Sequence, residues 1–166
     1  MFMGLTYTEA AEFLALKKTW NSTSFPWKPK NRTGIPPTLE CLFTLKGDYG
    51  VMEDVLVVLR HKSSSIPGVP NSFNAVLLFH QQRLVSLDEN GLRKHTNRVG
   101  IGMPFFGQTL THPHLHIPVP DSMDGYAEPI DTRDIQEMWQ VFLTTSGIIG
   151  APALHLPTSE QLELSL

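Results

Sequence analysis

The sequence predicts an α+β domain with a mainly antiparallel sheet of four to six strands, packed by an N-terminal and a C-terminal helix. Three observations support this class: a helix start signal near the first residues, a central series of short apolar segments, and an amphipathic segment near the end. The connections between the apolar segments are short. Short connections favour antiparallel neighbours, because parallel strands need long crossovers.

The first helix is expected to begin at Thr6. Thr6 and Glu9 form a capping box, in which the hydroxyl and the carboxylate pair free backbone amides at a helix start. Lys17 and Lys18 follow, and cations suit the negative end of the helix dipole. The apolar positions recur at helical spacing and predict one buried face, made of Ala10, Phe13, Leu14 and Trp20.

Four segments in the middle of the chain have strand character: 39–45, 51–60, 73–79 and 83–88. The first alternates apolar and polar residues, which indicates a strand with one solvent-exposed face. The second is almost wholly apolar and suggests a buried central strand. Residues 21–37 contain four prolines and should form a loop held to the core by Trp27.

The last helix is predicted from an apolar stripe at i, i+3, i+4, i+7 and i+8, which we expect to pack on the sheet: Ile135, Met138, Trp139, Phe142 and Leu143. Residues 98–111 contain three glycines and a proline, so we expect a mobile loop there. Residues 148–166 resemble a docking tail that ends in a short helix from Ser159.

The chain of 166 residues, 41% of them hydrophobic, should fold as a single globular domain spanning 1–166. It lacks an apolar segment of the roughly 18 residues that cross a membrane, and its N-terminus lacks a secretion signal pattern. We therefore expect a soluble, cytoplasmic protein without a membrane partner. Cys41 is the single cysteine, which excludes an internal disulfide, and it should be a buried structural residue.

The charged residues are distributed unevenly along the chain. Residues 1–98 carry 12 basic and 8 acidic residues, whereas residues 99–166 carry one basic and 8 acidic residues. Arg93, Lys94 and Arg98 precede the histidine-rich segment, where they could hold a phosphate. An acidic chain is a poor general binder of nucleic acids, so a local contact with RNA is the form that this hypothesis takes.

Four of the seven histidines lie within 22 residues: His95, His112, His114 and His116. In a strand, side chains at i and i+2 share a face, so His114 and His116 should stand side by side. A structural role, in which these histidines only stabilise the sheet, is one interpretation.

Acid–base cleavage of a phosphodiester is a second interpretation. One imidazole removes a proton, another protonates the leaving oxygen, and nearby cations stabilise the phosphate. A metal site is a third, in which His114 and His116 bind a divalent ion together with Asp88, Glu128 or His95.

The chain also resembles an uncharacterised bacterial and phage family. The shared elements are a Leu-Asp-x-x-Gly at 87–91, a His-Thr-Asn at 95–97 and a Pro-His-Leu-His-Ile at 113–117. That family is distantly similar to TumE-type toxins, the ribonuclease halves of toxin–antitoxin pairs. The resemblance implies that His95, His114 and His116 are the functional positions and that Asp88 is an orienting carboxylate.

Residues 107–117 are also similar to the histidine-triad signature of nucleotide hydrolases. In that family the imidazole that corresponds to His114 attacks an α-phosphate. The resemblance further implies a long helix and a strand before the signature, whereas residues 83–110 predict turns and loop.

The leading hypothesis is a toxin-like or phage-defence ribonuclease that works without a cofactor. Its catalytic residues would be Asp88, His95, His114 and His116, and its substrate-binding residues would be Arg93, Lys94, Arg98 and His112. An antitoxin or a defence protein is the expected protein partner. The alternative is a non-enzymatic phage or mobile-element protein that inhibits another protein, in the manner of anti-CRISPR proteins.

Overall fold

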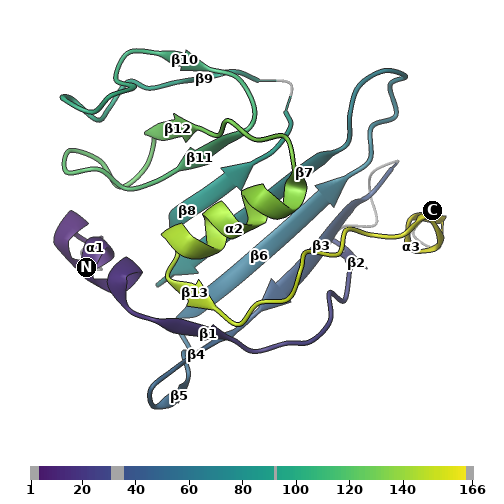
Figure 1. The fold of residues 1–166 in the computed structure, drawn as a ribbon, viewed down its shortest axis with the longest axis horizontal. Coiled ribbons are helices and arrows are strands. Elements are labelled where there is room, and N and C mark those ends of the chain that lie inside the picture. The colour runs from purple at the N-terminus through teal and green to yellow at the C-terminus, as the bar shows by residue number, and fades with distance from the viewer. Residues whose placement is uncertain (1–3, 31–35, 92, 164–166) are drawn as a thin grey trace.

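The computed structural model describes residues 4–30, 36–91 and 93–163. Its centre is a seven-stranded antiparallel sheet with the strand order β12-β11-β8-β7-β6-β3-β2 (Figure 1). Within it, every pair of neighbouring strands is antiparallel. The strands are β2 (Lys28–Pro29), β3 (Thr38–Phe43), β6 (Val55–Lys62), β7 (Ser72–Phe79), β8 (Gln82–Asp88), β11 (His114–His116) and β12 (Ala127–Pro129).

Two smaller sheets accompany the central one. A four-stranded mixed sheet has the order β13-β1-β4-β5, and a two-stranded sheet pairs β10 with β9. The predicted α+β class with a mainly antiparallel sheet is confirmed, but the predicted number of four to six strands was too low. The central sheet has seven strands because β2 and β12, of two and three residues, are too short to show a period. The strands of the smaller sheets are equally short: β1 (Lys18–Trp20), β4 (Leu45–Gly47), β5 (Gly50–Val51), β9 (His95–Thr96), β10 (Thr109–Leu110) and β13 (Ile148–Ile149).

The first helix, α1 (Tyr7–Ala15), has the predicted capping box: the Thr6 amide donates to the Glu9 carboxylate, and the Glu9 amide donates to the Thr6 hydroxyl. Lys18 lies beyond the helix and caps its C-terminal end, because its ammonium group donates to the carbonyl oxygens of Phe13 and Leu16. The prediction that Trp20 belongs to the helical face was wrong, since this residue lies in β1.

The amphipathic segment forms α2 (Ile135–Thr145), which begins at its N-cap Asp134. Figure 1 shows this helix lying over one face of the central sheet, in front of β8 and β6. Trp139 and Phe142 are fully buried against the sheet. A third helix, α3 (Ser159–Glu163), begins where the sequence predicted one. In the part of the chain described here, no helix has the length and hydrophobicity that crossing a membrane requires.

Two buried tryptophans hold the segment that follows β13 against the core. The indole N–H of Trp139 donates to the Pro152 carbonyl, and that of Trp27 donates to the His155 carbonyl. Trp27 thereby holds the segment before β3 against the core, as predicted. The prediction of a loop over residues 21–37 was wrong at Lys28 and Pro29, which form β2, and its residues 31–35 lie outside the described ranges. Cys41 is buried, and desolvation raises the pKa of its thiol to about 12, which fits the expected structural role.

The two faces of the central sheet differ in chemistry, because side chains opposite one another in adjacent strands share a face. One row across the sheet is apolar and fully buried under α2: Cys41, Leu59, Ala75, Leu87 and Leu115. The next row, on the opposite face, is polar: Glu40, Arg60, Asn74, Asp88 and His114. The candidate site lies at the β11 end of this polar row.

Candidate functional site

The pairing of β8 with β11 brings the first two site residues together. His114 lies directly opposite Asp88, and His116 lies opposite Ser86. The antiparallel register therefore places all three side chains of interest on the polar face: those of Asp88, His114 and His116. The predicted common face of His114 and His116 is present.

Three side-chain atoms converge at this point. The Nε2 atom of His116 lies 3.2 Å from Oδ2 of Asp88, and Nε2 of His114 lies 3.6 Å from the same oxygen. The two Nε2 atoms are 3.1 Å apart. We call Asp88, His114 and His116 the Asp–His–His cluster.

Neighbouring groups fix the orientation of two members of the cluster. The Asn74 side-chain amide donates to Oδ1 of Asp88 over 2.6 Å, which leaves Oδ2 directed at the histidines. The Nδ1 atom of His114 lies 3.2 Å from the Thr111 carbonyl oxygen, which can only accept, so Nδ1 carries the proton. Neutral His114 thus presents the lone pair of Nε2 to the cluster.

Burial determines the charge on His114. The residue is 2% exposed, and desolvation lowers the pKa of its imidazole to about 4. His114 is therefore neutral near pH 7. Burial acts to raise the pKa of the Asp88 carboxyl, but the hydrogen bond to His116, the neighbouring imidazoles and the Asn74 amide outweigh it and lower this pKa. The cluster at neutral pH contains a carboxylate beside a neutral imidazole.

His95 reaches the cluster from the two-stranded sheet. Its ring centroid lies 4.5 Å from that of His116 and 5.6 Å from that of His114. Its Nε2 atom lies 3.0 Å from both the Asn97 amide oxygen and the Gly125 carbonyl oxygen. Both partners accept, so Nε2 carries the proton and Nδ1 keeps a lone pair. His95 is half-buried, which makes Nδ1 a candidate proton acceptor at the rim.

Asn97 holds this region together, and the sequence hypothesis gave it no role. Its buried side chain donates to the carbonyl oxygens of Phe105 and Ala127 and accepts from the Ala127 amide. These bonds connect β9, the turns that follow it and β12. The His-Thr-Asn motif contained the signal, since a buried asparagine needs partners for its whole amide. Asn74 was missed because its contact with Asp88 depends on strand register.

The segment that was expected to be a mobile loop is attached at several points. The Gly100 amide donates to the Asp121 carboxylate over 2.9 Å. Gly100 has φ of 84°, and a Cβ atom there would lie 2.5 Å from the Tyr126 ring, so the turn requires glycine. The prediction of a loop over residues 98–111 was wrong at Thr109 and Leu110, which form β10 and pair with β9, and the mobility of this segment stays a prediction.

His112 lies beside the cluster, with its ring stacked on that of His114 at a centroid distance of 4.5 Å. A hollow of about 440 Å³ opens next to it. Arg133 lines this hollow, and its guanidinium group donates to the His112 carbonyl oxygen. Arg133 is a cation near the site that the sequence hypothesis did not include.

The three predicted phosphate-binding residues are exposed: Arg93, Lys94 and Arg98. Within the described ranges, no hydrogen bond or ion pair joins their side chains to the cluster. Glu128, the other carboxylate considered for a metal site, lies opposite Leu115, so it belongs to the apolar row. Asp88, Glu128 and His95 were the candidates to complete a metal site with His114 and His116. Asp88 is the one that contributes a ligand atom close to the Nε2 atoms of both histidines.

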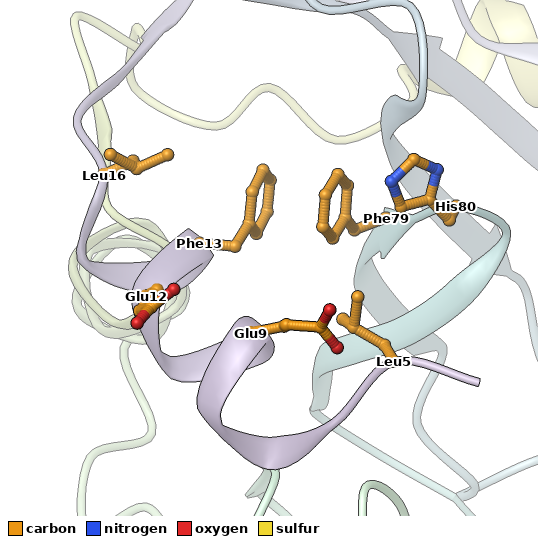
Figure 2. A pocket seen from close by; sticks show the side chains of 7 residues that line it. All are labelled: Leu5, Glu9, Glu12, Phe13, Leu16, Phe79 and His80. Atoms are coloured by element: carbon orange, nitrogen blue, oxygen red, sulfur yellow. The ribbon is translucent and has the colours of Figure 1, made fainter. Parts of the chain in front are cut away.

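A second hollow, of about 380 Å³, lies at the other end of the β7–β8 hairpin, where α1 packs on it (Figure 2). Figure 2 shows the stacked rings of Phe13 and Phe79, whose centroids are 3.9 Å apart. Its carboxylate Glu9 already caps α1, and the hydrogen bonds from Thr6 lower the pKa of that carboxyl. The reactive groups gather at the Asp–His–His cluster instead.

Comparisons of this chain with protein-family models, with curated proteins and with solved structures found no match.

Proposed function

We propose that this protein cleaves phosphodiester bonds in RNA and that Asp88, His95, His114 and His116 are its catalytic residues. One observation supports the proposal above the others. Three separate segments, the end of β8, β9 and β11, bring a carboxylate and three imidazoles together, with the His95 ring 4.5 Å from that of His116. Clustered groups of this kind are typical of acid–base sites.

The geometry suggests a division of roles. Nδ1 of His95 takes the proton from a ribose 2′-hydroxyl, and the 2′-oxygen forms a bond to phosphorus. The bond between phosphorus and the 5′-oxygen breaks, and that oxygen takes a proton from the Asp–His–His cluster. His114 is a poor proton donor near pH 7, because its pKa of about 4 keeps it neutral. The cluster therefore delivers the proton through His116, whose Nε2 atom lies 3.2 Å from Oδ2 of Asp88; a divalent ion held by the cluster would supply it from bound water instead.

RNA cleavage by the purified protein tests this proposal. A labelled RNA oligonucleotide should be cleaved, and a DNA oligonucleotide of the same sequence should stay intact because it lacks the 2′-hydroxyl. His95→Ala should lower the rate by about 10²–10⁴-fold, the usual contribution of a general base. His155→Ala is the matched control, since this exposed histidine lies in the C-terminal segment.

Two outcomes would contradict the proposal. The first is an inactive wild-type protein on RNA oligonucleotides of varied sequence. The second is equal cleavage by the wild-type protein and the His95→Ala variant, which would indicate a contaminating nuclease.

The burial of the cluster favours a second candidate, a non-enzymatic protein that binds and inhibits a protein partner. His114 and His116 are 2% and 8% exposed, which leaves little imidazole surface for a large substrate. In that case, expression in cells should be harmless with and without His95→Ala, and a stable complex should copurify. Cell death that depends on His95 would support the toxin-like enzyme instead.

A further inference from the structure

We propose that the Asp–His–His cluster binds one divalent transition-metal ion, of the class of manganese, iron, cobalt, nickel or zinc. The binding site is inferred from geometry alone. Its role as a catalytic ion rests on the proposed function. One ligand atom from each of Asp88, His114 and His116 lies within 4.8 Å of the other two.

The spacing of the three atoms fits a common ion. Imidazole nitrogens and carboxylate oxygens bind such ions at about 2.0–2.2 Å, so neighbouring ligands in octahedral or tetrahedral geometry lie about 3.0–3.5 Å apart. The separations here are 3.1 Å between the Nε2 atoms, and 3.2 Å and 3.6 Å from these atoms to Oδ2 of Asp88. Only the separation of 3.6 Å, between Nε2 of His114 and Oδ2 of Asp88, exceeds this range, so one of these two side chains must move slightly to bind the ion.

The protonation pattern also suits a cation. Nε2 of His114 offers a lone pair, because Nδ1 of the same ring donates to Thr111. Oδ2 of the Asp88 carboxylate lies at the same point, 3.2 Å from Nε2 of His116 and 3.6 Å from Nε2 of His114. Both partners of His116 Nε2, which are Oδ2 of Asp88 and Nε2 of His114, are acceptors, so this nitrogen carries the ring proton in the ion-free structure. A bound ion would displace that proton to Nδ1, which is buried and has no hydrogen-bond partner. The electron pairs of His114 and Asp88 thus converge on one point, and displacement of the His116 proton by the ion would add a third.

Outer contacts hold the ligands in place. Metal-binding histidines usually donate their other ring N–H to a carbonyl oxygen or a carboxylate, and ligating carboxylates are themselves hydrogen-bonded. His114 has such a contact with the Thr111 carbonyl oxygen, and Oδ1 of Asp88 accepts from Asn74. Two of the three ligands are therefore oriented before any ion arrives.

The cluster offers three protein ligands and leaves positions open. Nε2 of His95 is engaged by Asn97 and Gly125, and both nitrogens of His112 lie near backbone carbonyl oxygens. Three protein ligands with open positions are typical of catalytic rather than structural ions. A divalent ion held by two neutral imidazoles and one carboxylate would leave the occupied site with a net positive charge, which attracts a phosphate.

The ion also accounts for catalysis at a buried cluster. A metal ion is small enough to reach the Nε2 atoms of His114 and His116, which a polynucleotide cannot contact. The Asp88 side chain is 26% exposed, so solvent and ions reach the cluster at this carboxylate. Water on the ion has a lowered pKa and can supply the proton that the 5′-oxygen takes. His95, at the rim, remains the proton acceptor.

Titration calorimetry on metal-stripped protein tests the site. Manganese, nickel and zinc chlorides are added separately to the wild-type protein and to the Asp88→Asn, His114→Gln and His116→Gln variants. We expect one ion per chain for at least one metal and an affinity at least tenfold lower in each variant. His155→Ala is the control and should bind as the wild type does.

Folding of each variant is checked by circular dichroism, and Asp88→Asn keeps the size of the side chain. As a second measurement, cobalt(II) absorption in the visible region reports its ligands directly and should change in Asp88→Asn. The proposal is overturned if the wild-type protein binds none of these ions at micromolar concentration. It is also overturned if folded Asp88→Asn and His116→Gln variants bind as tightly as the wild type.

The two proposals can fail separately. If the ion binds at the cluster and RNA stays intact, the metal site stands and the ribonuclease proposal fails. If RNA is cleaved equally with and without a chelator by a protein that binds no ion, the metal site fails and the ribonuclease proposal stands.

Discussion

Neighbouring residues of one strand serve different purposes in this fold. Leu87 belongs to the buried apolar row under α2, and Asp88, the next residue of β8, belongs to the polar row that ends at the cluster. The same alternation separates Leu115 from His114 and His116 in β11. Because a strand sends successive side chains to opposite faces, one face can be optimised for packing while the other carries reactive groups.

The largest effect on stability is expected on the apolar face. Leu87→Ala should lower the free energy of unfolding by about 2–5 kcal/mol, because it opens a cavity in a fully buried core. Chemical denaturation measures the change. The control is Leu42→Ala on the opposite face of β3, where the side chain is 55% exposed and the expected loss is below about 1 kcal/mol. Equal losses at the two positions would show that the faces do not differ as described.

Asn74→Ala should have a smaller effect on stability and a clear effect on the cluster. It removes the donor to Oδ1 of Asp88 and should cost about 1–3 kcal/mol. It should also weaken metal binding by about 10–100-fold, the usual effect of losing an outer contact. Denaturation and calorimetry give the two values. Asn71→Ala, at an exposed asparagine, is the control, and unchanged binding in Asn74→Ala would contradict the positioning role.

A histidine on the apolar face makes the smallest expected contribution, one that depends on pH. His61 is buried, and desolvation lowers the pKa of its imidazole below 6.5. The unfolded chain therefore binds a proton more readily, so this contribution is complete above about pH 6.5 and is lost as the pH falls through that value. In metal-free protein, His61→Leu should reduce the fall in unfolding free energy between pH 7.5 and pH 5. An unchanged pH profile would exclude this effect.

Long elements of the fold were predictable from the sequence. The capping box of Thr6 and Glu9 located the start of α1, and the apolar stripe of α2 extends over several turns. Strands β7 and β8 were long enough to be recognised. In contrast, the parallel pairing of Lys18 with Ile148 joins distant parts of the chain through strands of two or three residues. Such contacts arise from tertiary packing and leave no local period.

The candidate site likewise has parts that the sequence predicts and parts that depend on tertiary structure. The period of a strand predicted that His114 and His116 share a face, and this needed no knowledge of other strands. Asp88 was predicted only through the family resemblance and as one of three candidate metal ligands, and Asn74 was not predicted, because both contacts depend on how β7, β8 and β11 are aligned. Burial of His114 was equally hidden, and by lowering the pKa of the imidazole to about 4 this burial makes a proton-donor role unfavourable near pH 7.

X-ray absorption spectroscopy at the metal edge tests the central claim most directly. Protein loaded with one equivalent of zinc or manganese should show two imidazole ligands and oxygen ligands at about 2.0–2.2 Å, and the imidazole signal should fall in His116→Gln. An ion that is coordinated by oxygen alone, or a spectrum that His116→Gln leaves unchanged, would contradict a metal site at Asp88, His114 and His116.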